Sequence, residues 1–287
     1  MLYLITASLI WAFSFGLLKE NLSDLHPSFV AWARLVIALP IFLPFFRLKS
    51  LTPRLALHLF FLGAFQYGLL YACYTEAFQY LDSYQVALFT IFMPIYVTIF
   101  DNIYKRQIDW FNLAMACLAV LGAAIIKYQQ DLPFHHIFWG FMLMQISNIC
   151  FSFGQIEYRR LRRLHTDIND RQVYALLFLG AVALTSITTT WRGGWGSFEL
   201  LTMTHVWTLL FLGILATGLG FFLWNVGAIT THAGVLAVMN NIKIPLAVFI
   251  SLAIFHEQTD ILRLILGGGI MILAVILSEY FRSRRKI

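Results

Sequence analysis

The chain has 287 residues, of which 60% are hydrophobic and 12% are charged. A soluble domain carries about half apolar and about a quarter charged residues, so this chain has too little charge to cover the surface of a soluble globule. The net charge of +6 does not indicate nucleic-acid binding, because the Lys and Arg residues form short clusters between long apolar runs. The composition predicts an integral membrane protein whose apolar excess faces the lipid bilayer.

Long apolar runs recur along the whole chain, separated by charged or turn residues. A helix that crosses the hydrocarbon core needs about 20 mostly apolar residues. Ten windows meet this requirement: Leu2–Leu18, Phe29–Phe46, Leu55–Ala77, Tyr84–Ile103, Trp110–Ile126, Ile137–Ile156, Val173–Trp191, Val206–Val226, Ala233–Phe255 and Ile261–Phe281. We therefore predict an all-α membrane protein of ten transmembrane helices. The runs are too long and too uniformly apolar for the strands of a β-barrel.

Lys and Arg gather in every second segment between these windows, namely 47–54, 105–106, 159–171 and 282–286. An excess of positive charge marks the cytoplasmic loops of a membrane protein. We therefore expect a multi-pass protein of a bacterial inner membrane with both termini in the cytoplasm. The first window lacks a basic leader and a small-residue cleavage site, so we predict a retained span rather than a signal peptide.

The two halves of the chain resemble each other. Residues 13–16 and 151–154 both read Phe-Ser-Phe-Gly, and at another common offset Pro94 pairs with Pro245. We predict two five-helix repeats, residues 1–130 and residues 134–287, the second ending in a basic tail. Because each repeat has an odd number of spans, the second must be inverted, an arrangement that builds a binding site near the middle of the membrane. A duplicated structural protein would carry the same repeat.

Lys243 is the most informative single residue, because it lies about 16 Å along the ninth window, near the centre of the bilayer. An ammonium there must face a cavity or a partner. Asn240 and Asn241 precede it, and Pro245 frees a backbone carbonyl beside them. We predict that this cluster binds the negative group of a substrate. A lysine paired internally to lock two helices is the alternative.

Arg34 and Glu76 are two further charged residues within the apolar windows. Each lies a few residues from the same end of its window, so the two side chains are expected at similar depth. An ion pair between adjacent helices is one interpretation. The other makes Glu76 an outer gate or a proton-coupling carboxylate.

Polar and aromatic side chains within the windows are candidates for the wall of a substrate path. Trp11, Tyr71, Tyr74 and Trp224 would supply apolar or stacking surface, and Asn225 a neutral hydrogen-bonding partner. For any one of these residues, hydrogen bonding between helices is the simpler role, and Trp or Tyr near the end of a window would instead anchor the helix at the membrane interface.

Two motifs that suggest an enzyme lack the context they need. His165 and Asp170 have the H-x4-D spacing of membrane acyltransferases but lie in an Arg-rich loop, and His256-Glu257 lacks the second histidine of a zinc protease. We therefore predict no catalytic residues, no metal site and no cofactor. The chain also has no nucleotide-binding loop, so transport would be driven by a gradient or by exchange.

The sequence resembles the drug/metabolite transporter superfamily, EamA-type. The resemblance rests on residues 10–15 (Ile-Trp-Ala-Phe-Ser-Phe), on Arg34, on the paired prolines, and on residues 74–87 between the third and fourth windows. It implies ten helices in two inverted halves around a central substrate cavity. It also implies transport of amino acids, amines, carboxylates or vitamins, often with protons. Ala12 stands where the family often has glycine, and Arg106 occupies the place that matches Glu257 in the other half.

Together these observations predict a secondary transporter that moves a small carboxylate-bearing metabolite, an amino acid or a vitamin such as biotin, by alternating access. Its partners are the small-molecule substrate and the bilayer, without nucleic acid. Coupling to protons and a homodimer both stay open. The alternatives are an exporter of amines, drugs or other metabolites, a membrane-embedded lipid-modifying enzyme, and a structural or sensory subunit.

Overall fold

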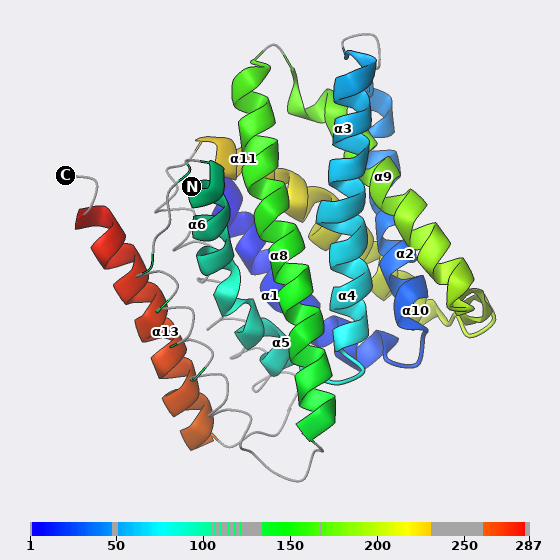
Figure 1. Cartoon of the computed structure of the whole chain (residues 1–287). Helices are drawn as coiled ribbons and strands as arrows, with labels where there is room; N and C mark the ends of the chain where they lie inside the picture. Colours follow the sequence, from blue (N-terminus) through cyan, green and yellow to red (C-terminus); the bar gives the residue numbers. More distant parts are fainter. Residues whose placement is uncertain are drawn as a thin grey trace.

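The structure is a computed structural model of the whole chain. It describes residues 2–47, 51–104, 106, 110, 114, 118, 121, 134–166, 168–230 and 261–284. Every regular element in these residues is helical, and the helices form a bundle (Figure 1). Six helical stretches of the described residues are long and apolar enough to cross a membrane: Leu2–Leu22, Pro53–Ala77, Ser83–Tyr104, Ile137–Leu164, Asp170–Trp191 and Met203–Thr230.

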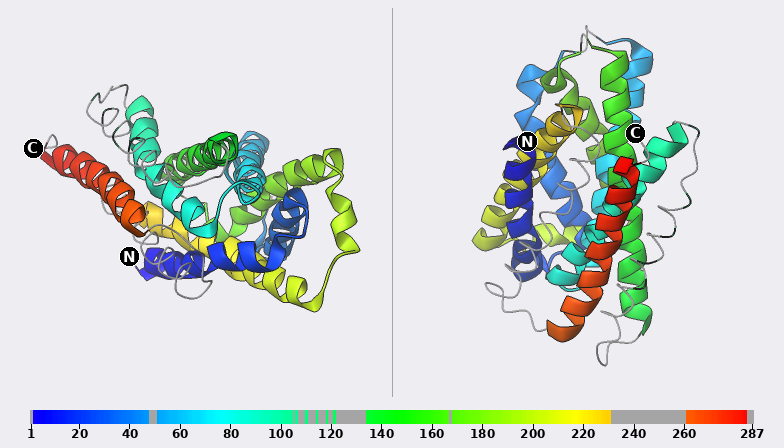
Figure 2. Two further views of the ribbon diagram at one scale, coloured as in Figure 1. Left: turned by 90° about the horizontal axis from the view of Figure 1, so that it is seen from below. Right: turned by 90° about the vertical axis from the view of Figure 1, so that its left-hand side faces the viewer.

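The described elements follow one another without strands between them. Up to residue 104 they are α1 (Leu2–Leu22), α2 (Pro27–Ala38), η1 (Leu39–Ile41), η2 (Leu43–Phe45), α3 (Pro53–Gly63), η4 (Ala64–Leu69), α4 (Leu70–Ala77), α5 (Ser83–Phe89), η5 (Thr90–Phe92) and α6 (Met93–Tyr104). From residue 134 they are α8 (Phe134–Leu164), α9 (Asp170–Trp191), η6 (Gly194–Phe198), α10 (Met203–Leu210), η7 (Phe211–Leu219), α11 (Gly220–Thr230) and α13 (Ile261–Arg284). The last helix, α13, lies at one edge of the bundle and contacts α6 (Figure 2).

Local sequence signals start several of these helices. Thr52 accepts a hydrogen bond from the backbone N–H of Leu55 and is followed by Pro53, so both of the usual helix-start signals are present. Gln85 bonds back to the backbone N–H of Asp82 at 2.9 Å, and Thr202 and His205 cap α10 reciprocally. Each cap fixes where a transmembrane segment begins.

The predicted windows and the helices agree, with one exception, where both can be compared. Windows Trp110–Ile126 and Ala233–Phe255 fall wholly or mostly outside the described residues. One window is wrong in detail: Phe29–Phe46 was expected as a single helix, yet α2 ends at Ala38 and two 3-10 turns follow. Pro40 and Pro44 explain the change, because neither can donate the backbone hydrogen bond that an α-helix needs.

Two spans contain a π-helical segment that the apolar pattern did not reveal. η4 joins α3 to α4, and η7 joins α10 to α11. Such segments are rare inside α-helices and are frequent at functional sites, because the extra residue in the turn leaves backbone groups free and re-aims side chains. The side chains and backbone carbonyls of these two spans are therefore candidates for a functional site.

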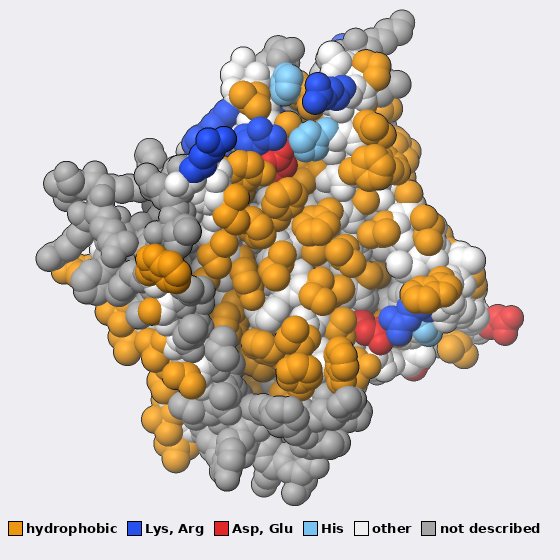
Figure 3. Space-filling model, in the orientation of Figure 1, with side chains coloured by type: hydrophobic (Ala, Val, Ile, Leu, Met, Phe, Trp, Pro, Cys, Tyr) orange, Lys and Arg blue, Asp and Glu red, His pale blue; other side chains and the backbone are white. Residues whose placement is uncertain are grey.

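The exterior of the bundle is apolar where lipid would cover it. Leu57, Phe61, Ile187 and Trp207 are each more than half exposed. Hydrophobic side chains cover the middle of the face in Figure 3, and charged side chains gather toward the two ends of that face. This is the distribution of a membrane-spanning protein rather than of a soluble one.

Helices α3 and α9 cross at two glycines. A methyl group on Gly63 would lie 1.9 Å from the carbonyl oxygen of Leu177, and one on Gly180 would lie 1.8 Å from that of Phe60. Small residues at such a crossing let two backbones approach closely, which is a main source of packing energy between helices in a membrane.

We expect Gly180→Ala to lower the apparent melting temperature of the purified protein in detergent by several degrees. The added methyl group must push α9 away from α3, at a cost of about 1–3 kcal/mol. Gly269→Ala in α13 is the matched control, since no atom of the described residues lies within 4 Å of a methyl group there. Equal melting temperatures for the two variants would contradict the tight crossing.

Candidate functional site

A cavity lies inside the bundle and is lined by residues from both halves of the chain. Its volume is about 60 Å³, room for a few water molecules or for one end of a small ligand. The lining residues come from α1, α2, α4, the η5–α6 junction, α8 and α11: Trp11, Ser14, Phe15, Arg34, Leu70, Tyr71, Tyr74, Thr90, Met93, Met144, Ser147, Phe151 and Phe221. The wall is mostly apolar and aromatic, with few polar groups, as is usual for small-molecule sites.

Arg34 supplies the charge of this cavity. Its side chain is 2% exposed, its Nε donates to the Thr217 hydroxyl at 3.2 Å, and its Nη2 donates to the Tyr71 hydroxyl at 2.9 Å. Its Nη1 has no hydrogen-bond partner. No ion pair of the described residues includes Arg34. The guanidinium is therefore a buried positive charge with an unused donor.

Aromatic rings partly compensate this charge. The guanidinium carbon lies 4.5 Å from the ring centroid of Tyr71 and 5.8 Å from that of Tyr74. A desolvated cation over an aromatic face gains about 2 kcal/mol. This gain offsets part of the cost of burying the charge and leaves the donor on Nη1 unused.

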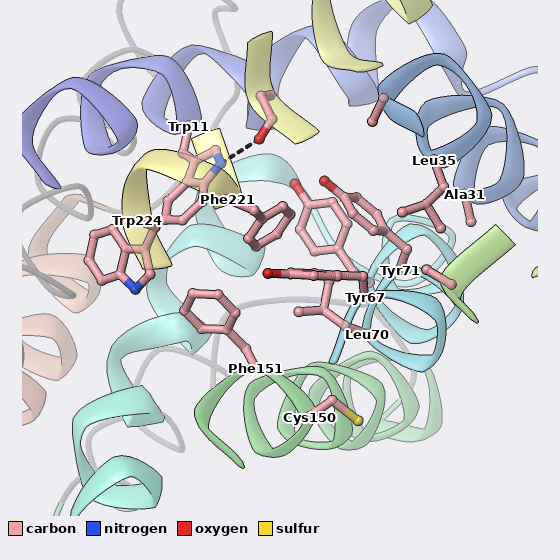
Figure 4. Close-up of a cluster of buried hydrophobic side chains, with 14 of the residues drawn as sticks. Trp11, Ala31, Leu35, Tyr67, Leu70, Tyr71, Cys150, Phe151, Phe221 and Trp224 are labelled. Atoms are coloured by element: carbon pink, nitrogen blue, oxygen red, sulfur yellow. Dashed lines mark hydrogen bonds between the residues drawn. The ribbon is translucent and has the colours of Figure 1, made fainter. Parts of the chain in front are cut away.

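Trp11 is held in the wall by the irregular backbone of η7. Its Nε1 donates to the carbonyl oxygen of Ala216 at 2.8 Å, the dashed line in Figure 4. The Trp11 ring lies 5.1 Å from the rings of both Phe221 and Trp224, and Phe151 meets it edge-on at 6.0 Å. The four rings come from α1, α8 and α11 and form one aromatic cluster (Figure 4).

Several residues predicted from sequence meet at this place. Trp11, Arg34, Tyr71 and Tyr74 line the cavity, whereas Trp224 and Asn225 do not. Trp224 packs behind Trp11, and Asn225 donates to the Tyr67 hydroxyl at 2.9 Å.

Lys243, Asn240 and Asn241 lie outside the described residues, so their predicted role stays a prediction.

Of the two interpretations of Arg34 and Glu76, the ion pair is not formed in the structure, and the role of gate or coupling residues stays a prediction. Both carboxylate oxygens of Glu76 bind the guanidinium of Arg192, at 2.7 and 2.9 Å, where α9 ends. Beside this pair, burial and then the charge of Arg192 lower the pKa of His26. The His26 ring therefore stays neutral near pH 7, and its Nδ1 accepts from the backbone N–H of Ser28 at 3.3 Å. Glu76 lies at one end of the bundle and not in the cavity.

The other end of the bundle carries a second charged cluster. Glu157 of α8 binds Arg160 at 2.6 Å and His58 of α3 at 3.1 Å, and it accepts a hydrogen bond from Tyr104 of α6. We call these two places the Glu76 end and the Glu157 end. Each ties helices together at one end of the bundle.

Four further residues belong to the site although the sequence pattern did not indicate them: Thr217, Ser147, Phe151 and Phe221. Thr217 bonds to both Arg34 and Tyr71, and its hydroxyl also donates to the Leu212 carbonyl at 2.8 Å. The sequence signal was faint: a threonine beside two glycines in an otherwise apolar run. Only the π-helical backbone of η7 aims this hydroxyl at α2.

Comparison with known proteins supplies the family. The model of the EamA-like transporter family matches residues 1–128 and 138–280. The chain belongs to the EamA-like transporter family. A "Probable biotin transporter" of Pseudomonas aeruginosa is 36% identical to this EamA-like chain over 275 residues, which cover 95% of each protein. A "Biotin transporter" of Salmonella typhimurium is 34% identical over 95% of this chain and 90% of its own length.

Two further comparisons agree. A "Biotin transporter" of Escherichia coli K12 is 35% identical over 90% of this EamA-like chain and 86% of its own length. A crystal structure of a protein with 13% identity covers 100% of this chain and 98% of its own, with a TM-score of 0.67, which supports the fold. The family and its members are transporters rather than enzymes, so this is a multi-pass membrane transporter for a small molecule.

We expect double-mutant cycles to show that Glu76 pairs with Arg192 and not with Arg34. Glu76→Gln and Arg192→Gln should couple by about 0.2–1 kcal/mol in unfolding free energy, because the pair is partly exposed. Glu76→Gln and Arg34→Gln should be additive. Thermal unfolding of the single and double variants in detergent measures both cycles. Coupling of Glu76 to Arg34 would contradict the geometry.

Proposed function

We propose that this protein is a secondary transporter that takes up a small carboxylate-bearing vitamin of the biotin class by alternating access. The observation that carries the proposal is Arg34, a buried guanidinium in the cavity with an unused donor and no acid partner among the described residues. The names of the relatives at 34–36% identity support biotin as the substrate.

The charge of the cavity favours an anion over a cation. A carboxylate that enters the cavity would gain a charge-assisted hydrogen bond from Arg34 Nη1, which is stronger than a neutral one. An amine would meet a positive charge at short range in a medium of low dielectric constant, where repulsion is large. The exporter of amines is therefore the weaker alternative.

Transport of a whole vitamin requires the cavity to enlarge. At about 60 Å³ it holds one end of such a molecule, so the helices around it would have to move during the cycle. The Glu76–Arg192 pair ties α4 to the end of α9, and the Glu157 cluster ties α3 and α6 to α8. We propose that these clusters act as gates that open alternately, with energy supplied by a gradient or by exchange.

The proposal includes an architecture and an orientation. Ten helices would form two inverted five-helix repeats, residues 1–130 and 134–287, in a bacterial inner membrane. The basic segments around residues 47–54 and 159–171 would face the cytoplasm together with both termini, so the Glu76 end would face outward. Lys243, with Asn240 and Asn241, would be a second place on the path that attracts the substrate's negative group.

We expect Arg34→Ala to lower uptake of labelled biotin roughly tenfold or more, since the carboxylate loses its charged partner. The measurement uses a biotin auxotroph without its own biotin transporter, with uptake normalised to the amount of protein in the membrane. Arg171→Ala removes an exposed arginine and is the control. The absence of uptake by the wild-type protein would exclude biotin as its substrate, and uptake by Arg34→Ala equal to wild type would exclude the role of Arg34.

Substitution of Lys243 tests whether Arg34 or Lys243 binds the carboxylate. If Arg34 binds the carboxylate, Arg34→Ala should abolish the preference for biotin over biotin amide as a competitor, and Lys243→Ala should keep that preference while slowing uptake. Competition with both compounds in the same uptake assay gives the preference directly. The reverse result would assign the carboxylate to Lys243.

A further inference from the structure

Three buried side-chain amides next to the cavity have unused hydrogen-bonding atoms. Neither amide atom of Gln66 has a partner, and Gln155 Nε2 and Asn225 Oδ1 also have none. The three residues are at most 1% exposed. Buried polar atoms in native proteins are nearly always hydrogen-bonded, so three such residues in one region indicate a missing partner. We call Gln66, Gln155 and Asn225 the amide layer.

Contacts between three helices bring the amide layer together. The side chain of Gln66 in η4 lies on α8 at Gly154, where a methyl group would be 2.1 Å from its Cγ. The next residue, Gln155, accepts a hydrogen bond from Trp224 of α11 at 3.1 Å. The residue after Trp224 is Asn225, which donates to Tyr67, the neighbour of Gln66. The contacts therefore close a ring through η4, α8 and α11.

The aromatic cluster separates the amide layer from the cavity. Trp11, Phe151 and Phe221 line the cavity, but none of the three amides does. Trp224 packs against Trp11 at 5.1 Å and against Phe151 at 6.2 Å, and its Nε1 points to Gln155. Figure 4 shows these rings around the space beside Tyr67. A shift of the rings would join the cavity to the amide layer.

Other buried amides do not share this arrangement. Gln145 and Asn148 of α8 also have an unused atom each, but they bond to each other, to Tyr96 and to the carbonyl of Phe89. They therefore belong to the contact between α8 and the α5–α6 span. Of the residues that the structure describes, Gln66 is the buried amide with both atoms unused.

We propose that the amide layer is a second substrate subsite, which binds a neutral group with both hydrogen-bond donors and acceptors, such as a cyclic urea. This rests on the proposed function, in which Arg34 binds the carboxylate. Arg34 bonds to Tyr71, and Gln66 lies five residues earlier on the same span, about 7 Å along the helix axis. Biotin carries a cyclic urea and a carboxylate at the two ends of a short aliphatic chain, so it could reach both places.

We expect Gln66→Met to leave the stability of the substrate-free protein unchanged and to weaken binding of a urea group. The amide of Gln66 makes no hydrogen bond in this structure, so its removal breaks none, and Met fills nearly the same space against Gly154. The substrate-free protein should keep its melting temperature. Binding of a urea group should weaken, because a site built to hydrogen-bond a group discriminates strongly against analogues that lack it.

Competition for labelled biotin uptake tests the subsite. Desthiobiotin keeps the urea and the carboxylate, and lipoate keeps the carboxylate without the urea. Wild type should prefer desthiobiotin strongly, and Gln66→Met should reduce that preference roughly tenfold. Gln155→Glu is the second variant, because it keeps an acceptor for Trp224 Nε1 and removes the unused donor. Gln145→Met is the control and should keep the wild-type preference.

The outcomes separate the two proposals. If wild type does not transport biotin, the proposed function is wrong. If wild type transports biotin but Gln66→Met and Gln155→Glu both keep the preference within about twofold, the function stands and the amide layer is not a substrate subsite. A lower melting temperature of Gln66→Met with an unchanged preference would likewise overturn the subsite and assign Gln66 to packing.

Discussion

A buried guanidinium with no acid partner among the described residues is the constraint on which the site depends. Arg34 lies in a medium of low dielectric constant, and the ion pairs of the described residues leave it out. Two hydroxyls and two aromatic faces stabilise it without neutralising it. The partial compensation has a functional consequence. A full ion pair would occupy the charge, and a bare charge would destabilise the fold, whereas this arrangement stabilises the cation and leaves one donor unused, on which the proposed binding of an anion rests.

The two π-helical segments build the surroundings of this charge. In η7, the backbone offers the Ala216 carbonyl to Trp11, and the Thr217 hydroxyl reaches Arg34. In η4, the extra residue in the turn places Gln66 against Gly154 and Tyr67 against Tyr174, at 2.7 Å between hydroxyls. Irregular backbone within a membrane is tolerated where it is buried in protein or lines a cavity. Here both segments adjoin the aromatic cluster.

The ends of the bundle differ in chemistry from its middle. Glu76 with Arg192 at one end is a partly exposed ion pair that contributes modestly to stability. At the other end Glu157 is itself buried, and its partners His58 and Arg160 are partly exposed. Between them, the tight glycine crossing of α3 and α9 stabilises the bundle through close backbone packing. The molecule thus combines a tight helix crossing with ion pairs at its two ends.

The sequence by itself determined the membrane class, the positions of the helices that can be compared, and the family, because apolar runs of about 20 residues have few folded alternatives. Trp11, Tyr71 and Tyr74, which the sequence offered for the wall of a substrate path, line the cavity, and Arg34, which it offered as a gate or coupling residue, lines it with them. The tertiary structure decided which charges meet. Arg34 and Glu76 have matching depths, but depth does not fix the rotation of a helix, and Glu76 turns to Arg192. The π segments and the amide layer likewise depend on packing between distant helices, which no local pattern encodes.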